Sequence, residues 1–455
     1  MLHSSVPAGA IPDAVIALCR QIRDGGHRAW VVGGSLRDVL MERPPGDWDV
    51  ATSATPEQVR GIFRRVVPTG EKHGTVTVLW RGGSYEVTTL RGEGGYSDGR
   101  RPDAVAFIDD IEADLARRDF TVNALAYEPF EDRLIDPAAG LADLAAGVLR
   151  TVGRAEDRFR EDGLRPLRAA RFVATLELAL EPATRDAIKT SLDVFARVSA
   201  ERVRDEWLKT MAARAPSRAF EVMRETGLLG VSCPDLVEQV GCEQNRYHAF
   251  DVWTHSLHCL DACPPDPTQR MAGLLHDLGK PRTRERSPAH GDWTFYRHEL
   301  VGADMADHWL RAFRFANDAR ERIVHLVRHH LVCYADDWSD AAVRRFVRRI
   351  GLPAVEPLLA LARADALAKG RPVEDELGGL ERLRERIARA VEAGAAFGLK
   401  ELAVTGGDVM ARLAIPPGPA VGKVLEALLQ RVLEDPALNE REALLRVVDE
   451  LGAQV

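Results

Sequence analysis

Residues 31–50, VVGGSLRDVLMERPPGDWDV, join a glycine pair to an Asp-x-Asp motif. A short apolar run predicts a strand that ends at Gly33 and Gly34, and Ser35 and Arg37 follow where a helix is expected to begin. Glycine allows the backbone to approach a ligand closely, and the free N–H groups at a helix N-terminus favour phosphate. This turn is therefore a candidate phosphate-binding element.

Asp47 and Asp49 lie two residues apart in a second predicted strand, so their side chains project from the same face. Two neighbouring carboxylates repel each other unless a cation lies between them, and ligands that are all oxygen favour Mg²⁺. A phosphate-binding turn followed by metal-binding carboxylates suggests nucleotidyl transfer. Each motif is common in proteins, and either one taken alone could be structural.

The composition limits the classes to which the chain can belong. A length of 455 residues predicts about three or four domains. The formal net charge of −8 does not indicate nucleic-acid binding, although a local basic surface would be sufficient for it. The six cysteines are scattered and form no CxxC pair, as is typical of a reducing compartment. No signal peptide and no long apolar run are visible. We therefore predict a cytoplasmic protein with no membrane segment.

Strand signals concentrate in the first 150 residues and nearly vanish after residue 155. We expect an amphipathic helix over 11–28, a hairpin of strands at 74–80 and 84–89, and helices over 114–127 and 161–180. The chain is therefore predicted to be an α+β multidomain protein, with a small mixed sheet at the N-terminal end and helices beyond it.

Charged side chains follow the hairpin. Glu86 lies on its second strand, directly before a polar, glycine-rich loop at 92–103 that we expect to border an active site. Arg117, Arg118 and Asp119 follow in the next segment, where Arg117 or Arg118 could bind the phosphates of a triphosphate. Farther on, Glu161, Arg165 and Arg168 share a helix face. Asp162 lies three residues before Arg165, and these two could present a hydrogen-bond acceptor and donors to a base. Solvated charge clusters are the structural alternative in both segments.

Histidines crowd one part of the chain. Ten of the 13 histidines lie between His248 and His330, and His276 is followed directly by Asp277 in a predicted helix. A His-Asp pair flanked by further histidines at long separations is typical of ligands that several helices gather around a metal ion. Any one of these histidines could be structural, but the set predicts a metal site.

Several segments together resemble one enzyme family. GGSxRD at 33–38 followed by DxD at 47–49 resembles the signature of polymerase-β-type nucleotidyltransferases. RRDFTVNA at 117–124 resembles the second motif of the class II branch, which contains tRNA CCA-adding enzymes and bacterial poly(A) polymerases. Residues 136–153, EDGLR at 161–165 and the segment 201–209 resemble the third, fourth and fifth motifs. The motifs occur in the family's order, which is more specific than any single match.

The resemblance implies a role for each candidate residue. Asp47, Asp49 and Glu86 would be catalytic, with Mg²⁺ bound to Asp47 and Asp49, activating an RNA 3′-hydroxyl and neutralising pyrophosphate. The glycine turn would hold the triphosphate, and the helix at 161–180 would read the base. The implied nucleotide-binding residues are Gly33, Gly34, Ser35, Arg37, Arg118, Asp119, Asp162, Arg165 and Arg168.

The histidine-rich block resembles the HD phosphohydrolase domain that some of these enzymes carry. The basic ligand pattern matches His255, His276, Asp277 and Asp365, and the additional ligands of two-metal members match His298, His329 and His330. The resemblance implies a divalent transition metal and hydrolysis of 2′,3′-cyclic phosphodiesters or phosphate monoesters.

The likeness also bears on substrate and organisation. Residues 68–75 and 95–103 resemble CCA-adding enzymes more than poly(A) polymerases, so we expect CCA addition to tRNA from CTP and ATP. Poly(A) polymerase and A-adding enzyme are the alternatives; a phosphohydrolase with an inactive head and a non-catalytic RNA-binding module are two further readings. The oligomeric state is left open.

The implied domains are a polymerase-β-like nucleotidyltransferase head (1–150), an all-α nucleotide-selecting neck (151–240), an HD-type metal-binding helical domain (241–370) and a helical RNA-binding tail (371–455).

Overall fold

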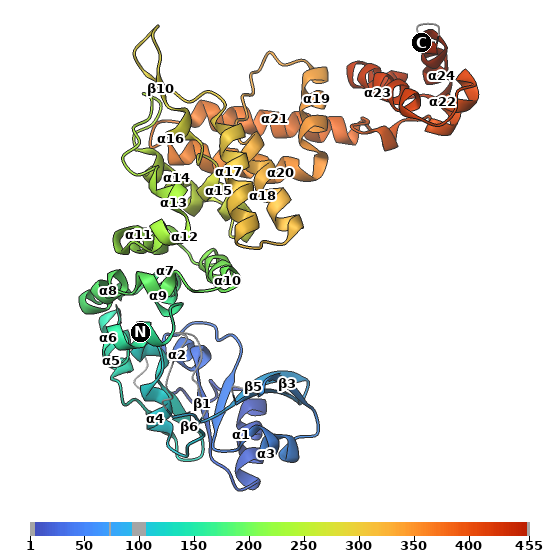
Figure 1. Cartoon of the computed structure of the whole chain (residues 1–455). Coiled ribbons are helices and arrows are strands. Elements are labelled where there is room, and N and C mark those ends of the chain that lie inside the picture. Colours follow the sequence, from blue (N-terminus) through green and yellow to red (C-terminus); the bar gives the residue numbers. More distant parts are fainter. Residues whose placement is uncertain (1–4, 72–73, 93–105, 453–455) are drawn as a thin grey trace. The chain divides into compact units, whose positions relative to one another are not determined.

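A computed structural model describes residues 5–71, 74–92 and 106–452 (Figure 1). The chain divides into two compact units, Met1–Val237 and Glu238–Val455. The division falls close to the predicted border at 240, whereas the predicted borders at 150 and 370 lie inside the units. Most of the loop predicted at 92–103 lies outside the described residues.

The first unit contains a mixed seven-stranded sheet with the order β3-β4-β5-β2-β1-β6-β7. Neighbouring strands are antiparallel except for β2 and β5, which are parallel. The strands are β1 (Ala29–Val32), β2 (Asp49–Thr52), β3 (Val66–Gly70), β4 (Thr75–Trp80), β5 (Gly83–Thr89), β6 (Ala126–Glu128) and β7 (Arg133–Ile135).

Apolar cores cover both faces of this sheet. On one face, α1 (Asp13–Asp24) and α3 (Pro56–Ile62) pack against Val31 and its neighbours. On the other face, α4 (Ile111–Ala116) packs against Trp30 and its neighbours. All four residues of β1 are buried, which explains the unbroken apolar run in the sequence.

The predicted hairpin is confirmed. Strands β4 and β5 pair from Thr75 opposite Thr88 to Trp80 opposite Gly83. The two turn residues, Arg81 and Gly82, have φ angles of 47° and 83°. Positive φ at both central positions is typical of the tight turns whose twist matches that of the flanking strands.

Two helix predictions were wrong in detail. Within 114–127, α4 ends at Ala116, the short 3-10 helix η2 (Thr121–Asn123) follows, and β6 joins the sheet beside β1. Residues 120–126 are buried throughout, so their apolar spacing carries no strand alternation. Within 161–180, α6 (Ala155–Glu161) and α7 (Arg165–Leu176) are separate helices. The helix breaks where Asp162 is extended, with φ −143° and ψ 107°, and Pro166 lies in the first turn of α7. Only glycine fits at position 163, because a Cβ there would lie 2.5 Å from the carbonyl oxygen of Val194.

Helices complete the first unit. They are α2 (Gly34–Leu40), α5 (Gly140–Ala146), α8 (Pro182–Lys189), α9 (Leu192–Phe195), α10 (Ala200–Thr210), α11 (Ser217–Thr226), α12 (Leu228–Ser232) and α13 (Pro234–Val237). A short parallel pair, β8 (Val148–Leu149) and β9 (Ala179–Leu180), is the other strand pairing among the described residues of this unit.

The second unit is helical apart from a small hairpin, β10 (Glu285–Arg286) with β11 (Trp293–Thr294). Its helices are α14 (Val252–Ala262), α15 (Pro267–Leu275), α16 (Lys280–Thr283), α17 (His298–Ala312), α18 (Asn317–His329), α19 (Asp340–Ile350), α20 (Leu352–Ala368), α21 (Glu374–Glu392), α22 (Gly406–Leu413), α23 (Pro419–Glu434) and α24 (Arg441–Gly452), with the 3-10 helices η3 (Leu399–Glu401) and η4 (Pro436–Leu438). The predicted α+β multidomain fold is confirmed.

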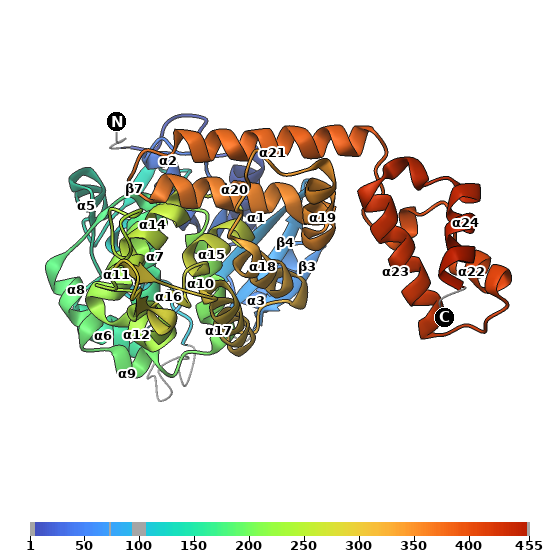
Figure 2. The same ribbon diagram turned by 90° about the horizontal axis from the view of Figure 1, so that it is seen from above.

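Helix α21, which the sequence assigns to the tail, runs beside α20 (Figures 1 and 2). A separate apolar core begins at Ala396 and joins α22, α23 and α24. In the described part of the chain, no helix has both the length and the apolar character that crossing a membrane requires.

Arg344 connects α19 to the last turn of α23. Its buried guanidinium donates from Nε to the carbonyl of Leu433 at 2.7 Å and from Nη2 to the carbonyl of Glu434 at 2.9 Å. Carbonyl groups in the last turn of a helix lack partners within the helix, and a positive charge there also complements the helix dipole. Arg344 is therefore a C-terminal cap for α23.

We expect Arg344→Ala to lower the free energy of unfolding by about 1–3 kcal/mol, because two carbonyl groups lose a charged donor. Thermal unfolding of the full chain measures this as a lower midpoint temperature. The control is Arg345→Ala, which removes the exposed neighbouring arginine. Equal midpoints for the two variants would contradict the capping role.

Candidate active site

A cleft of about 780 Å³ in the first unit gathers nearly all of the residues predicted for the head and neck. Ser35 is the exception, since it is buried and does not line the cleft. The predicted residues that line the cleft are Gly33, Gly34, Arg37, Asp47, Asp49, Glu86, Arg118, Asp119, Asp162, Arg165 and Arg168.

Three carboxylates occupy one end of the lining. The parallel register of β2 and β5 places Asp49 opposite Glu86. Burial, followed by the charge of Glu86, raises the pKa of Asp49 to about 6; Asp47 adds to this shift and Arg118 opposes it. Ser35 donates a hydrogen bond of 2.5 Å to the carbonyl of Asp47. These crowded carboxylates are a site where a bound cation would relieve repulsion.

Gly33 makes room for this group. Its φ angle is +87°, and a Cβ there would collide with Oδ2 of Asp49. A side chain at this position would therefore both strain the backbone and displace the carboxylate. The glycine in the opening motif is required by the position of Asp49, a role that the sequence did not reveal.

The rest of the cleft is strongly basic. Nine arginine and lysine side chains line it, against five carboxylates. Among the basic lining residues, Arg91 and Arg171 had no place in the sequence analysis, and Arg202 and Lys209 were part of the fifth motif without an assigned role. A chain with net charge −8 thus has a cleft whose lining is positive, as the binding of a polyphosphate requires.

Asp119 is fully engaged with protein groups. Its Oδ2 accepts from Nε and Nη2 of Arg168 at 2.8 and 2.6 Å, and its Oδ1 accepts from the side chain of Asn123 at 3.1 Å. Burial raises the pKa of this carboxyl, but Arg168 and Asn123 outweigh it and lower the pKa to about 2. Asn123 in turn accepts from Nη1 of Arg37 at 2.6 Å. Asp119 therefore fixes the orientation of Arg168 and, through Asn123, that of Arg37.

Asp162 lies between α6 and α7 and faces Arg202 of α10. Nη2 of Arg202 is 3.0 Å from Oδ1 and 2.8 Å from Oδ2 of Asp162. Oδ1 also accepts from the backbone N–H of Leu164 at 3.0 Å. Arg202 belongs to the segment that resembles the fifth motif, which was the available signal for it, but the contact with Asp162 needs the folded chain.

Arg165 is held from two sides. Its Nη1 donates to Oε2 of Glu161 at 2.7 Å, and its Nη2 donates to the carbonyl of Arg117 at 3.0 Å. The neighbouring Arg171 donates from Nε to the buried Glu206 at 2.6 Å and lies 4.0 Å from the ring centroid of Phe172. The guanidinium groups of α7 are thus fixed by acids and carbonyl groups before any ligand binds.

A cluster of histidine and aspartate side chains lies in the second unit. Oδ2 of Asp277 lies 3.4 Å from Nε2 of His255 and 3.1 Å from Nε2 of His276. Oδ1 of the same carboxylate lies 3.3 Å from Nε2 of His298 and 3.7 Å from Nε2 of His330. In each of these two groups the candidate ligand atoms lie within 4.8 Å of one another. Asp277 thus belongs to both groups of candidate ligands.

Asp365 joins the first group, with its Oδ1 at 3.0 Å from Nε2 of His255. The rings of His276, His298 and His330 are each 2.7–2.8 Å, at Nδ1, from the backbone carbonyl three residues earlier. An Nδ1–H that is bound to a carbonyl leaves the lone pair of Nε2 pointing into the cluster, as a metal ligand requires. Mixed nitrogen and oxygen donors fit a divalent transition metal.

The structure corrects one predicted ligand. His329, which the resemblance suggested as a seventh ligand, does not face the cluster. Its ring contacts that of His325, with the centroids 4.6 Å apart, and it belongs to neither group of ligand atoms. Neighbouring residues of a helix point about 100° apart, so His329 and His330 cannot both face the cluster. His330 takes the inner position.

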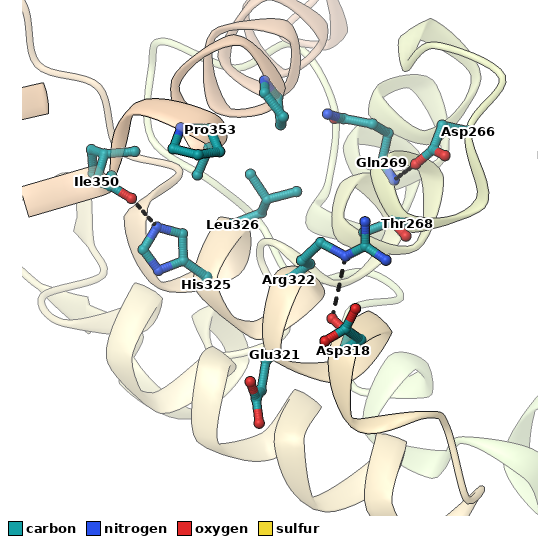
Figure 3. A pocket seen from close by; sticks show the side chains of 13 residues that line it. Asp266, Thr268, Gln269, Asp318, Glu321, Arg322, His325, Leu326, Ile350 and Pro353 are labelled. Atoms are coloured by element: carbon teal, nitrogen blue, oxygen red, sulfur yellow. Dashed lines mark hydrogen bonds between the residues drawn. The ribbon is translucent and has the colours of Figure 1, made fainter.

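A further cavity of about 700 Å³ borders α15, α18 and the start of α20 (Figure 3). Its polar side chains serve the backbone around them. Asp266 accepts from the N–H of Gln269 at 2.9 Å, His325 contacts the carbonyl of Ile350 at 2.8 Å, and Arg322 donates to the carbonyl of Asp318 at 3.3 Å. These three contacts satisfy backbone groups, two of them at helix ends.

Comparisons with known proteins agree with the geometry of the first cleft. A CCA-adding enzyme of Lactobacillus johnsonii is 32% identical, over 96% of this chain and 96% of its own length. The chain belongs to the family of CCA-adding enzymes. It is a tRNA nucleotidyltransferase by family, as the sequence motifs predicted. A CCA-adding enzyme of Geobacillus stearothermophilus is 35% identical, over 94% of each chain.

Structural and domain comparisons cover most of the chain. The crystal structure of the Bacillus stearothermophilus CCA-adding enzyme in complex with CTP matches with a TM-score of 0.74 and 31% identity, over 97% of each chain. The poly A polymerase head domain matches residues 29–150, a probable RNA- and SrmB-binding site of polymerase A matches 177–239, and the second domain of tRNA nucleotidyltransferases matches 292–448. His255, His276 and Asp277 lie outside these three matches.

The raised pKa of Asp49 gives this family member a testable pH dependence. The folded chain binds the Asp49 proton more tightly than the unfolded chain, in which an Asp pKa is about 3.9. The stability that this proton provides is fully present below about pH 4 and is lost as the pH rises through about 6. In a chelating buffer, we therefore expect Asp49→Asn to raise the free energy of unfolding by about 1–2 kcal/mol near neutral pH and by less at about pH 5.

Chemical denaturation at the two pH values measures the difference. Asp24→Asn, at an exposed position of α1, is the matched control and should change stability equally little at both. A gain for Asp49→Asn that does not depend on pH would show that Asp49 carries no raised pKa.

Proposed function

We propose that the chain adds CCA to the 3′ end of tRNA from CTP and ATP, with Mg²⁺ held by Asp47, Asp49 and Glu86. The observation that carries the proposal is the convergence of these three carboxylates at one end of a cleft whose lining is otherwise basic. Their donors are all oxygen, which fits Mg²⁺. The likeness to a CCA-adding enzyme crystallised with CTP supports the nucleotide assignment.

In the reaction, the 3′-hydroxyl of tRNA loses its proton to water, and its oxygen forms a bond with the α-phosphorus of the nucleotide. The bond from that phosphorus to the bridging oxygen breaks, and pyrophosphate leaves with its electron pair. When bound, Mg²⁺ would acidify the 3′-hydroxyl and offset the charge of pyrophosphate. Arg118, Arg168 and the other basic residues of the lining would bind the triphosphate through charge-assisted hydrogen bonds.

Selection of the base is assigned to Asp162 and Arg165, which line the same cleft. A carboxylate offers hydrogen-bond acceptors and a guanidinium offers donors. Asp162 and Arg165 can therefore bind the edge of a base in place of a nucleic-acid template. Arg202 keeps the Asp162 carboxylate in one orientation, and Glu161 does the same for Arg165. Addition of CTP and then ATP at one site requires this orientation to change between steps.

We expect Asp49→Ala to reduce incorporation of CMP and AMP into a tRNA that lacks its 3′ end by at least about a thousandfold, because the metal site loses a ligand. Incubation with each labelled nucleotide and gel separation of the products measures this. Asp24→Ala, at the exposed position of α1, should leave incorporation unchanged. Retained incorporation in Asp49→Ala would eliminate the transferase assignment, and repeated AMP addition by the unaltered protein would favour poly(A) synthesis.

A second activity has its own observation. We propose that the cluster around Asp277 is a metal site that hydrolyses phosphoesters. Six side chains from five segments of the second unit place Nε2 and carboxylate oxygen atoms together, and these are His255, His276, Asp277, His298, His330 and Asp365. Hydrolysis adds the oxygen of water to phosphorus, breaks the bond to the ester oxygen and transfers a proton to that oxygen. Bound metal ions would acidify the water.

We expect the double variant His276→Ala, Asp277→Ala to lose bound divalent metal and to lose hydrolysis of 2′,3′-cyclic AMP. Elemental analysis of the purified protein and a turnover assay with added Mn²⁺ are the two measurements. His329→Ala is the matched control because its ring lies outside the cluster, and it should keep both properties. Unchanged metal content and turnover in the double variant would make the cluster structural.

A further inference from the structure

We propose that Tyr247 and Tyr296 form a base-binding rim over the Asp277 cluster, so that this site takes the phosphoester of a single nucleotide unit. The inference rests on the phosphohydrolase function proposed above. It assigns the recognition of a base to two exposed aromatic side chains of the second unit, separate from the nucleotide cleft of the first unit.

A cavity of about 380 Å³ connects the rim to the cluster. Asp277, His298, His330 and Asp365 contribute to its lining, and so do both tyrosines. Ligand sites of small molecules start at about 300 Å³, so this cavity suits one nucleotide and is too small for a double helix.

Tyr296 is tied closely to a ligand of the cluster. Its side chain is 77% exposed, and it lies two residues before His298. The preceding residue, Phe295, is buried and its carbonyl is 2.7 Å from Nδ1 of His298. Arg297, between Tyr296 and His298, occupies the N-cap position of α17 with a φ angle of +63°. The backbone of Tyr296 is therefore held close to the cluster, and its exposed ring is open to a ligand.

The backbone of Tyr247, on another side of the cavity, is held by a neighbouring side chain. Its side chain is 60% exposed, and its N–H donates to the side chain of Asn245 at 3.3 Å. The same Asn245 oxygen lies 2.9 Å from Nδ1 of His248, whose ring packs edge-on against His255 of the cluster. The segment that carries Tyr247 is thus anchored on a candidate metal ligand.

A hydrogen bond links the segment that carries Tyr247 to the loop of the β10–β11 hairpin. The N–H of Arg246 donates to Oδ2 of Asp292 at 3.3 Å. Trp293, on strand β11, packs with the guanidinium groups of Arg284 and Arg286, whose Cζ atoms lie 4.2 and 4.9 Å from its ring centroid. Trp293 therefore supports the hairpin. Tyr247 also contacts a guanidinium group, since Cζ of Arg246 lies 5.2 Å from its ring centroid and Nη2 donates to its hydroxyl at 3.2 Å, but Tyr247 remains 60% exposed and Tyr296 77% exposed.

Cations line the cavity beside the cluster, where a phosphoester would bind: Arg246, Lys280 and Lys369 stand against the carboxylates of Asp277, Asp292 and Asp365. Nζ of Lys280 lies 2.6 Å from Oδ2 of Asp277 and 2.7 Å from the side-chain oxygen of Gln244, so a cation stands beside the cluster. Arg246 also lines the cavity, whereas Nζ of Lys369 is paired with Glu376 at 2.7 Å. Aromatic rings that stack on a base next to cations that bind phosphate are the usual means of binding single nucleotides or single-stranded ends.

The test uses the full chain loaded with Mn²⁺ and compares two esters that share a five-membered cyclic phosphate. One is 2′,3′-cyclic AMP, and the other is glycerol 1,2-cyclic phosphate, which has no base. We expect Tyr296→Leu to raise KM for 2′,3′-cyclic AMP about tenfold with little change in kcat, because one stacking contact is lost. Turnover of the glycerol ester should not change, and Tyr296→Phe should restore the KM for 2′,3′-cyclic AMP. Tyr247→Leu should act in the same direction.

An oligonucleotide that ends in a 2′,3′-cyclic phosphate distinguishes the source of the nucleotide unit. Preference for it over 2′,3′-cyclic AMP would assign the rim to RNA ends, and the reverse to free nucleotides. Equal losses on both cyclic esters, or an unchanged KM in Tyr296→Leu, would overturn the rim.

Absence of turnover of every ester by the unaltered protein would refute the phosphohydrolase function but not yet the rim. Calorimetric binding of adenosine 2′-phosphate and glycerol 2-phosphate would then decide. Weaker binding of the adenosine compound alone by Tyr296→Leu supports the rim, and equal affinities in the two proteins contradict it.

Discussion

Repulsion between carboxylates on neighbouring strands is the constraint on which the first unit depends. The parallel register of β2 and β5 sets Asp49 opposite Glu86, and Gly33 leaves the space that the Asp49 carboxylate occupies. The sheet could bury these positions more favourably with apolar residues, as it does along most of β1 and β2. The fold instead holds charge in a position that gains stability only when a cation binds.

Positive charge is organised around that group by the helices that follow the sheet. Asp119 orients Arg168, and Glu206 orients Arg171, so guanidinium groups on α7 are positioned by carboxylates from separate elements. Ion pairs of this kind reduce the conformational freedom that long basic side chains would otherwise lose on binding a polyphosphate. The cleft is therefore arranged in advance, although the chain as a whole is acidic.

The sequence predicted which residues lie together better than it predicted the local geometry. Motif order selected residues that line one cleft, among them Asp49, Asp162 and Arg165, and strand alternation located the hairpin correctly. Periodicity failed at β6, since a strand of three residues, Ala126–Glu128, is too short to show alternation. It also missed the break before Arg165, where Asp162 is extended and Pro166 lies in the first turn of α7. Partners such as Arg202 come from distant segments, so only the folded chain reveals them.

The double use of Asp277 has a consequence for how the second cluster could change during evolution. One oxygen of this carboxylate faces His255 and His276, and the other faces His298 and His330. Replacement of any one histidine would impair one half of the cluster, whereas a single codon change at Asp277 would disable both halves. A lineage that has the proposed phosphohydrolase activity could thus lose it in one mutational step and retain the helices of the second unit.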